Sequence, residues 1–274
     1  GFLGRLLTEY FSVRAYEVII VSRNKPSFSC DKFIRWDSNT VGDWAKELDG
    51  AEAIINLAGR NVNCRSTKAN KKQILDSRIN STRVIGEAIS RCAKPPRVWL
   101  NSSTATIYKH SFNRPMDEEG EIGASIVAKD AFSIEVARAW EKALEEASAP
   151  STRKVVLRTA MVFSDSKGGV FHVLRRLARF GLGGKMAGGK QFVSWIHEKD
   201  FCRAVEWLIK REDFVGVVNL AAPNPVTNCE TMRIFRKVNH MPLGLPATRW
   251  MLEVGAIFLR TETELIVKSR RVVP

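Results

Sequence analysis

The stretch GFLGRLLTEYF, residues 1–11, decides how the rest of the sequence is interpreted. Its apolar side chains recur at the spacing of one helical face: Leu3, Leu6, Leu7 and Tyr10. Gly1 and Gly4 stand at the start of this predicted helix, although a glycine inside a helix costs roughly 1 kcal/mol relative to alanine. One interpretation is a permissive helix cap. The other is the end of a phosphate-binding turn, where glycine lets a phosphate approach the N–H groups of a helix N-terminus.

A turn of that kind needs a strand before the helix and a second strand after it, with a ribose-recognising residue at the second strand's end. No strand precedes Gly1, whereas YEVIIVSR (16–23) predicts a strand that ends in Ser22 and Arg23. An acidic residue at this place would repel a 2′-phosphate, and a guanidinium offers it paired donors. We therefore expect NADP rather than NAD, with Lys25 adding charge. A solvated arginine at a strand end is the alternative interpretation.

The composition is that of a globular protein: 274 residues, 45% hydrophobic and 26% charged, which suffice for a full core. No apolar run approaches the ~18 residues of a membrane span. The net charge of +14 suggests an anionic partner. However, Lys and Arg are spread along the chain without aromatic interleaving, so we expect no nucleic-acid partner. Five scattered cysteines predict free thiols in a reducing compartment.

Strand-like and helix-like segments alternate along the chain, which favours an α/β fold with a Rossmann-type, doubly wound parallel sheet. The predicted strands are 16–23, 32–37, 51–59, 97–103, 153–163 and 216–223. The later predicted helices are 78–96, 130–147 and 200–210, the last capped by Asp200.

The pattern loosens after residue 170, where glycines gather in GLGGKMAGGKQF (181–192). We expect a dinucleotide-binding domain at 1–165 and, at 166–274, late sheet elements with a loop-rich substrate lobe over the sheet's C-terminal edge.

Two further motifs stand in the order expected after the first helix. INLAG (55–59) ends a strand with a small-residue turn, against which an adenosine can lie, although tight packing alone would explain it. NSSTATIY (101–108) follows the next strand. With Gly1 and Gly4, this series resembles the extended short-chain dehydrogenase/reductases of the sugar-nucleotide epimerase type.

Other segments narrow the resemblance: RWD (35–37), SRINSTR (77–83), AWEKA (139–143), GLGGKMAGGKQFVSWIHEKD (181–200) and VNLAAPNPVTN (218–228). They resemble the YfcH-type epimerases of bacteria, which have relatives in chloroplasts and, as short-chain dehydrogenase/reductase family 39U, in animals. The likeness to that family implies that the first strand and first glycine lie outside the sequence, as does most of a segment that follows RRVVP. Loss of a central strand would leave two sheet edges unpaired.

The resemblance also implies which residues contact NADP: Gly1, Phe2, Leu3, Gly4, Ser22, Arg23, Leu57, Ala58, Gly59, Gln73, Arg78 and Val162. The first four face the pyrophosphate, the next two hold the 2′-phosphate, and the turn 57–59 lies on the adenosine side. Gln73 and Arg78 follow on the next helix, and Val162 lies near the nicotinamide. Gln73 replaces the acidic residue usual in the family, and Ala160 replaces its usual glycine.

Catalysis in the superfamily implies a Ser or Thr hydroxyl, a tyrosine that transfers the proton, and a lysine four residues after it that lowers the tyrosine pKa. Thr104 fits the hydroxyl role. Aligning Glu141 with the usual glutamate puts Ser133 in the tyrosine place and Ala137 in the lysine place. The chain therefore lacks the Tyr-x-x-x-Lys pair, since none of its three tyrosines has a lysine four residues on.

Tyr108 is a substitute proton donor near Thr104, although a structural tyrosine is the favoured interpretation. His197 is more simply a brace beside Asp200 than a base, and Trp36, Trp140 and Trp195 are most simply core residues.

Two functions remain open at this stage. One is an NADP-dependent oxidoreductase or epimerase with an unusual proton donor, and the other is a non-catalytic NADPH sensor or scaffold. The expected partners are a dinucleotide and a small-molecule substrate of unknown identity, with a homodimer left open. The expected location is intracellular, in the cytoplasm or an organelle matrix such as the mitochondrial one.

Overall fold

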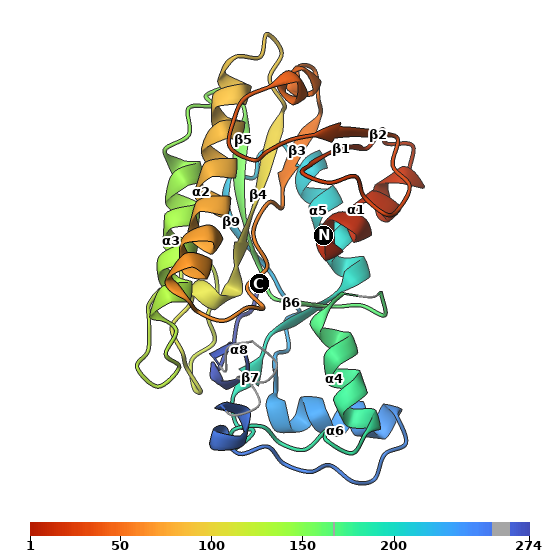
Figure 1. Ribbon diagram of the computed structural model, residues 1–274, viewed down its shortest axis with the longest axis vertical. Coiled ribbons are helices and arrows are strands. Elements are labelled where there is room, and N and C mark those ends of the chain that lie inside the picture. Colours follow the sequence, from red (N-terminus) through yellow and green to blue (C-terminus); the bar gives the residue numbers. More distant parts are fainter. Residues whose placement is uncertain (167, 254–263) are drawn as a thin grey trace.

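The computed structural model describes residues 1–166, 168–253 and 264–274. A parallel sheet with helices on both faces forms its larger part, as the alternating sequence pattern predicted, and a smaller lobe around α4 and α6 lies at one end (Figure 1). The strands are β1 (Ile19–Ser22), β2 (Lys32–Arg35), β3 (Ala53–Asn56), β4 (Val98–Thr104), β5 (Arg153–Thr159), β6 (Met161–Phe163), β7 (Phe192–Val193), β8 (Trp195–His197), β9 (Gly216–Leu220) and β10 (Val226–Thr227).

Helices alternate with most of these strands, as is typical of a doubly wound sheet. They are α1 (Phe2–Ser12), α2 (Lys68–Ser90), α3 (Ala131–Glu145), α4 (Val170–Arg179), α5 (Glu198–Lys210), α6 (Asn228–Val238) and α8 (Glu264–Val267), with short 3₁₀ helices at η1 (Asp43–Leu48) and η2 (Ala105–Ile107). Within the described residues, none of the helices is both long and apolar enough to cross a membrane.

Alternate residues of β4 enter two different cores. Val98 and Leu100 pack with α1 and α5, whereas Trp99 packs with α2 and α3. Figure 1 shows the same two layers, with α2 and α3 on one side of the sheet and α1 and α5 on the other. All three of these strand residues are fully buried, as expected for a parallel strand covered on both faces.

The backbone hydrogen bonding of the sheet is divided into two pieces. β1 pairs in parallel with β2, and β3, β4, β5 and β9 form a second parallel sheet in that order. Among the described residues, β1 and β3 are joined by side-chain packing alone: Val21 lies in the same apolar cluster as Ile54 and Ala58. Each of these two strands therefore has one edge without a ladder partner in the described part of the chain.

Several local expectations need correction. The run 153–163 forms two strands, because β6 leaves β5 at Ala160 to pair with β8. A helix, α4, stands in the segment expected to be loop-rich. The helix expected from residue 78 begins at Lys68, where the Thr67 hydroxyl accepts from the Asn70 N–H at 3.2 Å. Asp200 is not a cap, since α5 begins at Glu198.

Candidate functional site

The N-terminus of α1 lies beside the turn that follows β3. Gly1 is the N-cap of α1, and no described side chain caps its first turn. A Cβ added to Gly4 would lie 3.9 Å from Leu57 Cδ1, so the two glycine-containing motifs converge. The first N–H groups of a helix have no partner within it. The N–H groups of this turn are thus available to an anion at the sheet's carboxyl edge.

Asn56, which sequence analysis did not single out, fixes the turn at residues 57–59. Its Oδ1 accepts from the Ala58 N–H at 3.0 Å, and its Nδ2 donates to Asn101 Oδ1 at 2.7 Å. The sequence signal was available, because an asparagine that binds the backbone two residues on is a recognised turn former. A buried amide therefore holds Leu57, Ala58 and Gly59 in one conformation.

The guanidinium of Arg78 covers Gly59. A Cβ added to Gly59 would lie 3.1 Å from Arg78 Cζ, so a side chain there would press on the guanidinium. Arg78 Nη1 donates to the carbonyls of Ile74 at 2.9 Å and Arg60 at 3.2 Å. In the described ranges this guanidinium has no carboxylate partner, and burial lowers the pKa of Arg78 to about 10. A partly desolvated cation without a counter-ion is suited to an anionic ligand.

The end of β1 presents a second unpaired cation. Ser22 Oγ donates to the Asn24 carbonyl at 2.7 Å. Arg23 and Lys25 are exposed, and no ion pair joins either of them to another described residue. Gln73 is also exposed and accepts a hydrogen bond from Arg60 Nη1. Arg23 therefore has the free donors that the sequence interpretation required.

Phe2 and Val162 contribute to packing. A Cβ added to Gly169 would lie 3.0 Å from Phe2 Cζ, so the Phe2 ring packs against the loop after β6. The Val162 side chain is buried in the core that also contains Leu6 and Phe11. Any contact between Val162 and a ligand would therefore be made by the main chain of Val162.

Thr104 and Tyr108 flank η2 at the carboxyl end of β4 but differ in their surroundings. Thr104 is half-buried, and its Oγ1 accepts from the Thr106 N–H at 3.1 Å. Tyr108 is 2% exposed. Its hydroxyl donates to Asn219 Oδ1 at 2.8 Å and accepts from Arg158 Nη1 at 2.9 Å. Burial raises the pKa of Tyr108. These contacts match the structural interpretation of Tyr108.

Arg158 organises a buried polar cluster that sequence analysis missed. Its Nε and Nη2 donate to the two oxygens of Glu141 at 3.0 and 2.8 Å. The Ser103 hydroxyl donates to Glu141 Oε1 at 2.6 Å. The signal in the sequence was an arginine that directly follows the apolar run VVL (155–157) within a predicted strand. Through Glu141, Arg158 ties the end of β5 to α3, and Ser103 ties the end of β4 to the same helix.

The C-terminal segment reaches the loop after Thr104. Lys268 forms a fully buried ion pair with Asp130, and its Nζ donates to the Thr106 carbonyl at 2.6 Å. Sequence analysis recognised KSRR only as a basic cluster. His197 is the N-cap of α5, since its Nδ1 accepts from the Lys199 N–H at 3.2 Å. This structural role differs from the expected brace beside Asp200.

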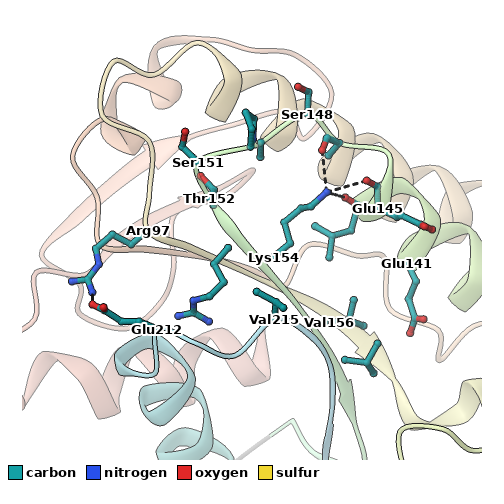
Figure 2. A pocket seen from close by; sticks show the side chains of 17 residues that line it. Arg97, Glu141, Glu145, Ser148, Ser151, Thr152, Lys154, Val156, Glu212 and Val215 are labelled. Carbon is teal, nitrogen blue, oxygen red and sulfur yellow. Dashed lines mark hydrogen bonds and ion pairs between the residues drawn. The ribbon is translucent and has the colours of Figure 1, made fainter.

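A wide hollow of about 1180 Å³ lies away from these motifs. Figure 2 shows its lining, in which the Lys154 ammonium turns toward the C-terminal end of α3 and Arg97 pairs with Glu212. Its residues come from the C-terminal half of α3, the loop after α3 and the amino ends of β5 and β9, whereas the motifs gather at the carboxyl ends. Because ligands of open α/β sheets bind at the carboxyl ends, the motifs define the candidate site.

Comparison with known proteins gives consistent matches. The family model described as "NAD dependent epimerase/dehydratase family" matches residues 1–221. The epimerase family protein SDR39U1 of Bos taurus is 31% identical over 278 residues, which span 100% of this chain and 89% of the relative. The epimerase family protein YfhF of Bacillus subtilis is 29% identical, over 100% of this chain and 88% of the relative.

Two solved structures are also similar. The crystal structure of human SDR39U1 (isoform 2) with NADPH gives a TM-score of 0.86 at 29% identity, covering 100% of this chain and 88% of that one. The nucleoside-diphosphate sugar epimerase from Corynebacterium glutamicum gives a TM-score of 0.71 at 26% identity, covering 99% of this chain and 56% of that one.

Proposed function

Since the chain belongs to the NAD dependent epimerase/dehydratase family, we propose that it binds NADPH in preference to NADH. The observation that carries the preference is Arg23, an exposed arginine without an ion-pair partner among the described residues, at the end of β1. A 2′-phosphate would give this guanidinium its counter-ion. The likeness to human SDR39U1, crystallised with NADPH, supports the same choice.

The residues present fit the rest of a dinucleotide. The uncapped first turn of α1 (residues 1–4) would hold the pyrophosphate. The fixed turn at 57–59 and the Arg78 guanidinium would lie along the adenosine side. The main chain near Val162 would face the nicotinamide, which carries the hydride when the cofactor is bound. In this proposal residues 1–165 hold the dinucleotide, and residues 166–274 supply the substrate lobe.

Isothermal titration of the protein with NADPH and with NADH tests the preference. We expect NADPH to bind at least about tenfold more tightly, since one charge-assisted hydrogen bond contributes roughly 1.5–3 kcal/mol. Equal dissociation constants for the two dinucleotides would contradict the proposal.

We propose further that turnover is slow. In α3 the tyrosine and lysine places hold Ser133 and Ala137, and the Tyr108 hydroxyl is occupied by Asn219 and Arg158. General acid–base catalysis typically contributes about 10²–10⁴-fold in rate, so its loss favours the alternative function, a nucleotide-binding sensor or scaffold. The half-buried Thr104 is the remaining polar group in the expected place.

A screen of sugar nucleotides with bound NADPH separates the two functions. If slow conversion of a substrate is detected, Thr104→Ala should abolish it while leaving NADPH affinity unchanged. A wild-type turnover near the usual ~10 s⁻¹ would exclude the non-catalytic function. Full activity of the Thr104→Ala variant would show that the hydroxyl role is misplaced.

A further inference from the structure

Half of the net positive charge of this protein lies in one part of the fold. Residues 168–191 and 228–253, here called the α4/α6 lobe, contain nine Lys and Arg side chains and two carboxylates. Their net charge of +7 is half of the chain's +14. Figure 1 shows α4 and α6 at one end of the molecule, on the side away from β1 and β2. Lys and Arg are spread along the chain, as the sequence indicated, and the excess positive charge of the lobe arises because it contains only two carboxylates.

The same lobe exposes large apolar side chains at neighbouring positions. Phe180 and Leu182 are 74% and 47% exposed, and Leu243 and Leu245 are 71% and 64% exposed. The two segments are joined by their main chains. The Leu245 N–H donates to the Gly181 carbonyl at 2.8 Å, and the Gly184 N–H donates to the Leu245 carbonyl at 3.2 Å. We call these four side chains the apolar tip.

Cations surround the apolar tip. Arg179 directly precedes Phe180, and Lys185 directly follows Gly184. Both are exposed, and within the described ranges no carboxylate pairs with either of them. Arg236 reaches the tip from α6, where its Nη1 donates to the Gly183 carbonyl. The carboxylates of the lobe have cationic partners of their own, since Glu230 pairs with Arg233 and Glu253 with Arg249.

We propose that the apolar tip docks on the surface of an anionic phospholipid bilayer. Apolar side chains that protrude beside Arg and Lys match the boundary between acyl chains and acidic headgroups. A second copy of the chain would bring the same positive charge to the contact, and like charges across an interface are unfavourable. Nucleic-acid platforms stack bases on aromatic rings, whereas three of the four tip residues are leucines.

Co-sedimentation of the full chain with vesicles tests this proposal. The protein should co-sediment with vesicles of phosphatidylcholine that contain about 30% phosphatidylserine, and it should not co-sediment with vesicles of phosphatidylcholine alone. Raising the salt to about 0.5 M should weaken binding about tenfold or more, because exposed charges are then screened.

Two double variants separate the apolar and the charged contributions. Phe180→Ser with Leu182→Ser, and Arg179→Glu with Lys185→Glu, should each weaken vesicle binding about tenfold or more. Matched controls lie elsewhere on the surface. Val13→Ser with Val215→Ser changes side chains that are 77% and 66% exposed, and Lys68→Glu with Arg83→Glu reverses two exposed cations of α2. Both controls should bind like the wild type. Circular dichroism should show the same fold in all variants.

Several results would overturn the proposal. One is the absence of binding to phosphatidylserine vesicles at low salt, and another is unchanged binding by the two tip variants. Equally tight binding to soluble polyglutamate would indicate an acidic protein partner instead. A dimer of the wild type that the tip variants convert to a monomer, observed by analytical ultracentrifugation, would indicate self-association.

Discussion

Arg78 and Arg158 are two enclosed arginines, each with its Cζ 5.0 Å from the centre of an aromatic ring, Trp140 and Tyr108 respectively. They differ in what neutralises them. Arg158 makes two hydrogen bonds to the Glu141 carboxylate, whereas Arg78 reaches only main-chain carbonyls among the described residues. Burial and an aromatic neighbour are common to both. The missing counter-ion is what marks the neighbourhood of Arg78 as a place for an anionic ligand.

The largest expected effect tests the structural arginine. Arg158→Met leaves the Glu141 carboxylate buried without its partner, so the free energy of unfolding should fall by about 3–5 kcal/mol. Urea denaturation followed by fluorescence measures it. The exposed control Arg83→Met should change stability by no more than about 0.5 kcal/mol. If Arg158→Met lowered the free energy of unfolding by less than about 1 kcal/mol, the pairing with Glu141 would not distinguish Arg158 from Arg78 in stability.

The next effect concerns the free cation at the end of β1. Arg23→Glu should weaken NADPH binding by about 1.5–3 kcal/mol, because it replaces a donor to the 2′-phosphate with a repelling charge. NADH affinity should stay the same or rise. Calorimetric titration measures both, with Lys94→Glu as a charge-matched control far from the site. If Arg23→Glu weakened the binding of NADPH and NADH equally, Arg23 would not contact the 2′-phosphate.

Arg78→Met should affect ligand binding more than folding. We expect weaker binding of NADPH and NADH alike, by about 1–2 kcal/mol. The reason is that Arg78 is proposed to contact the adenosine side, which the two dinucleotides share. The free energy of unfolding of the ligand-free protein should change by less than about 1 kcal/mol, because no buried carboxylate loses a partner. A large loss of stability with unchanged affinity would reverse this assignment.

The lowered pKa of Arg78 gives the same variant a pH signature. A folded pKa of about 10, against 12.5 for an ordinary arginine, means that the unfolded chain binds more protons between those two values. Stability contributed by this group therefore rises with pH above about 10 and is constant below it. The stability difference, wild type minus Arg78→Met, should increase from pH 9 to pH 11. A flat difference would show that Arg78 is well solvated.

The smallest effect belongs to Tyr108. Tyr108→Phe removes the hydroxyl that joins Arg158 to Asn219 and should cost about 1 kcal/mol of unfolding free energy. NADPH affinity should not change. Tyr16→Phe, at a half-buried tyrosine outside this cluster, is the matched control. Loss of turnover in Tyr108→Phe without any loss of stability would instead favour a catalytic hydroxyl.

A structural feature could be predicted from the sequence when the residues that determine it lie close together along the chain. The spacing of Ile85, Ala88 and Ile89 predicted the buried face of α2, because residues three and four apart in the sequence lie on the same face of a helix. The break between β5 and β6 was missed, because it depends on pairing with β8 some 30 residues later. The same holds for Arg158 with Glu141 and for Lys268 with Asp130, 138 residues apart. The partner of a single buried charged side chain can be identified only in the folded structure, because nothing in the neighbouring sequence specifies it.

The division of the sheet between β1 and β3 makes the proposed ligand a cross-link. Arg23 stands on one piece, and Gly59 with Arg78 on the other. A dinucleotide held by both would resist separation of the two pieces, between which the described backbone forms no ladder. Amide hydrogen exchange along the facing edges of β1 and β3 would then report local opening. Binding should slow this exchange more than it slows exchange in β4, which is bonded on both sides.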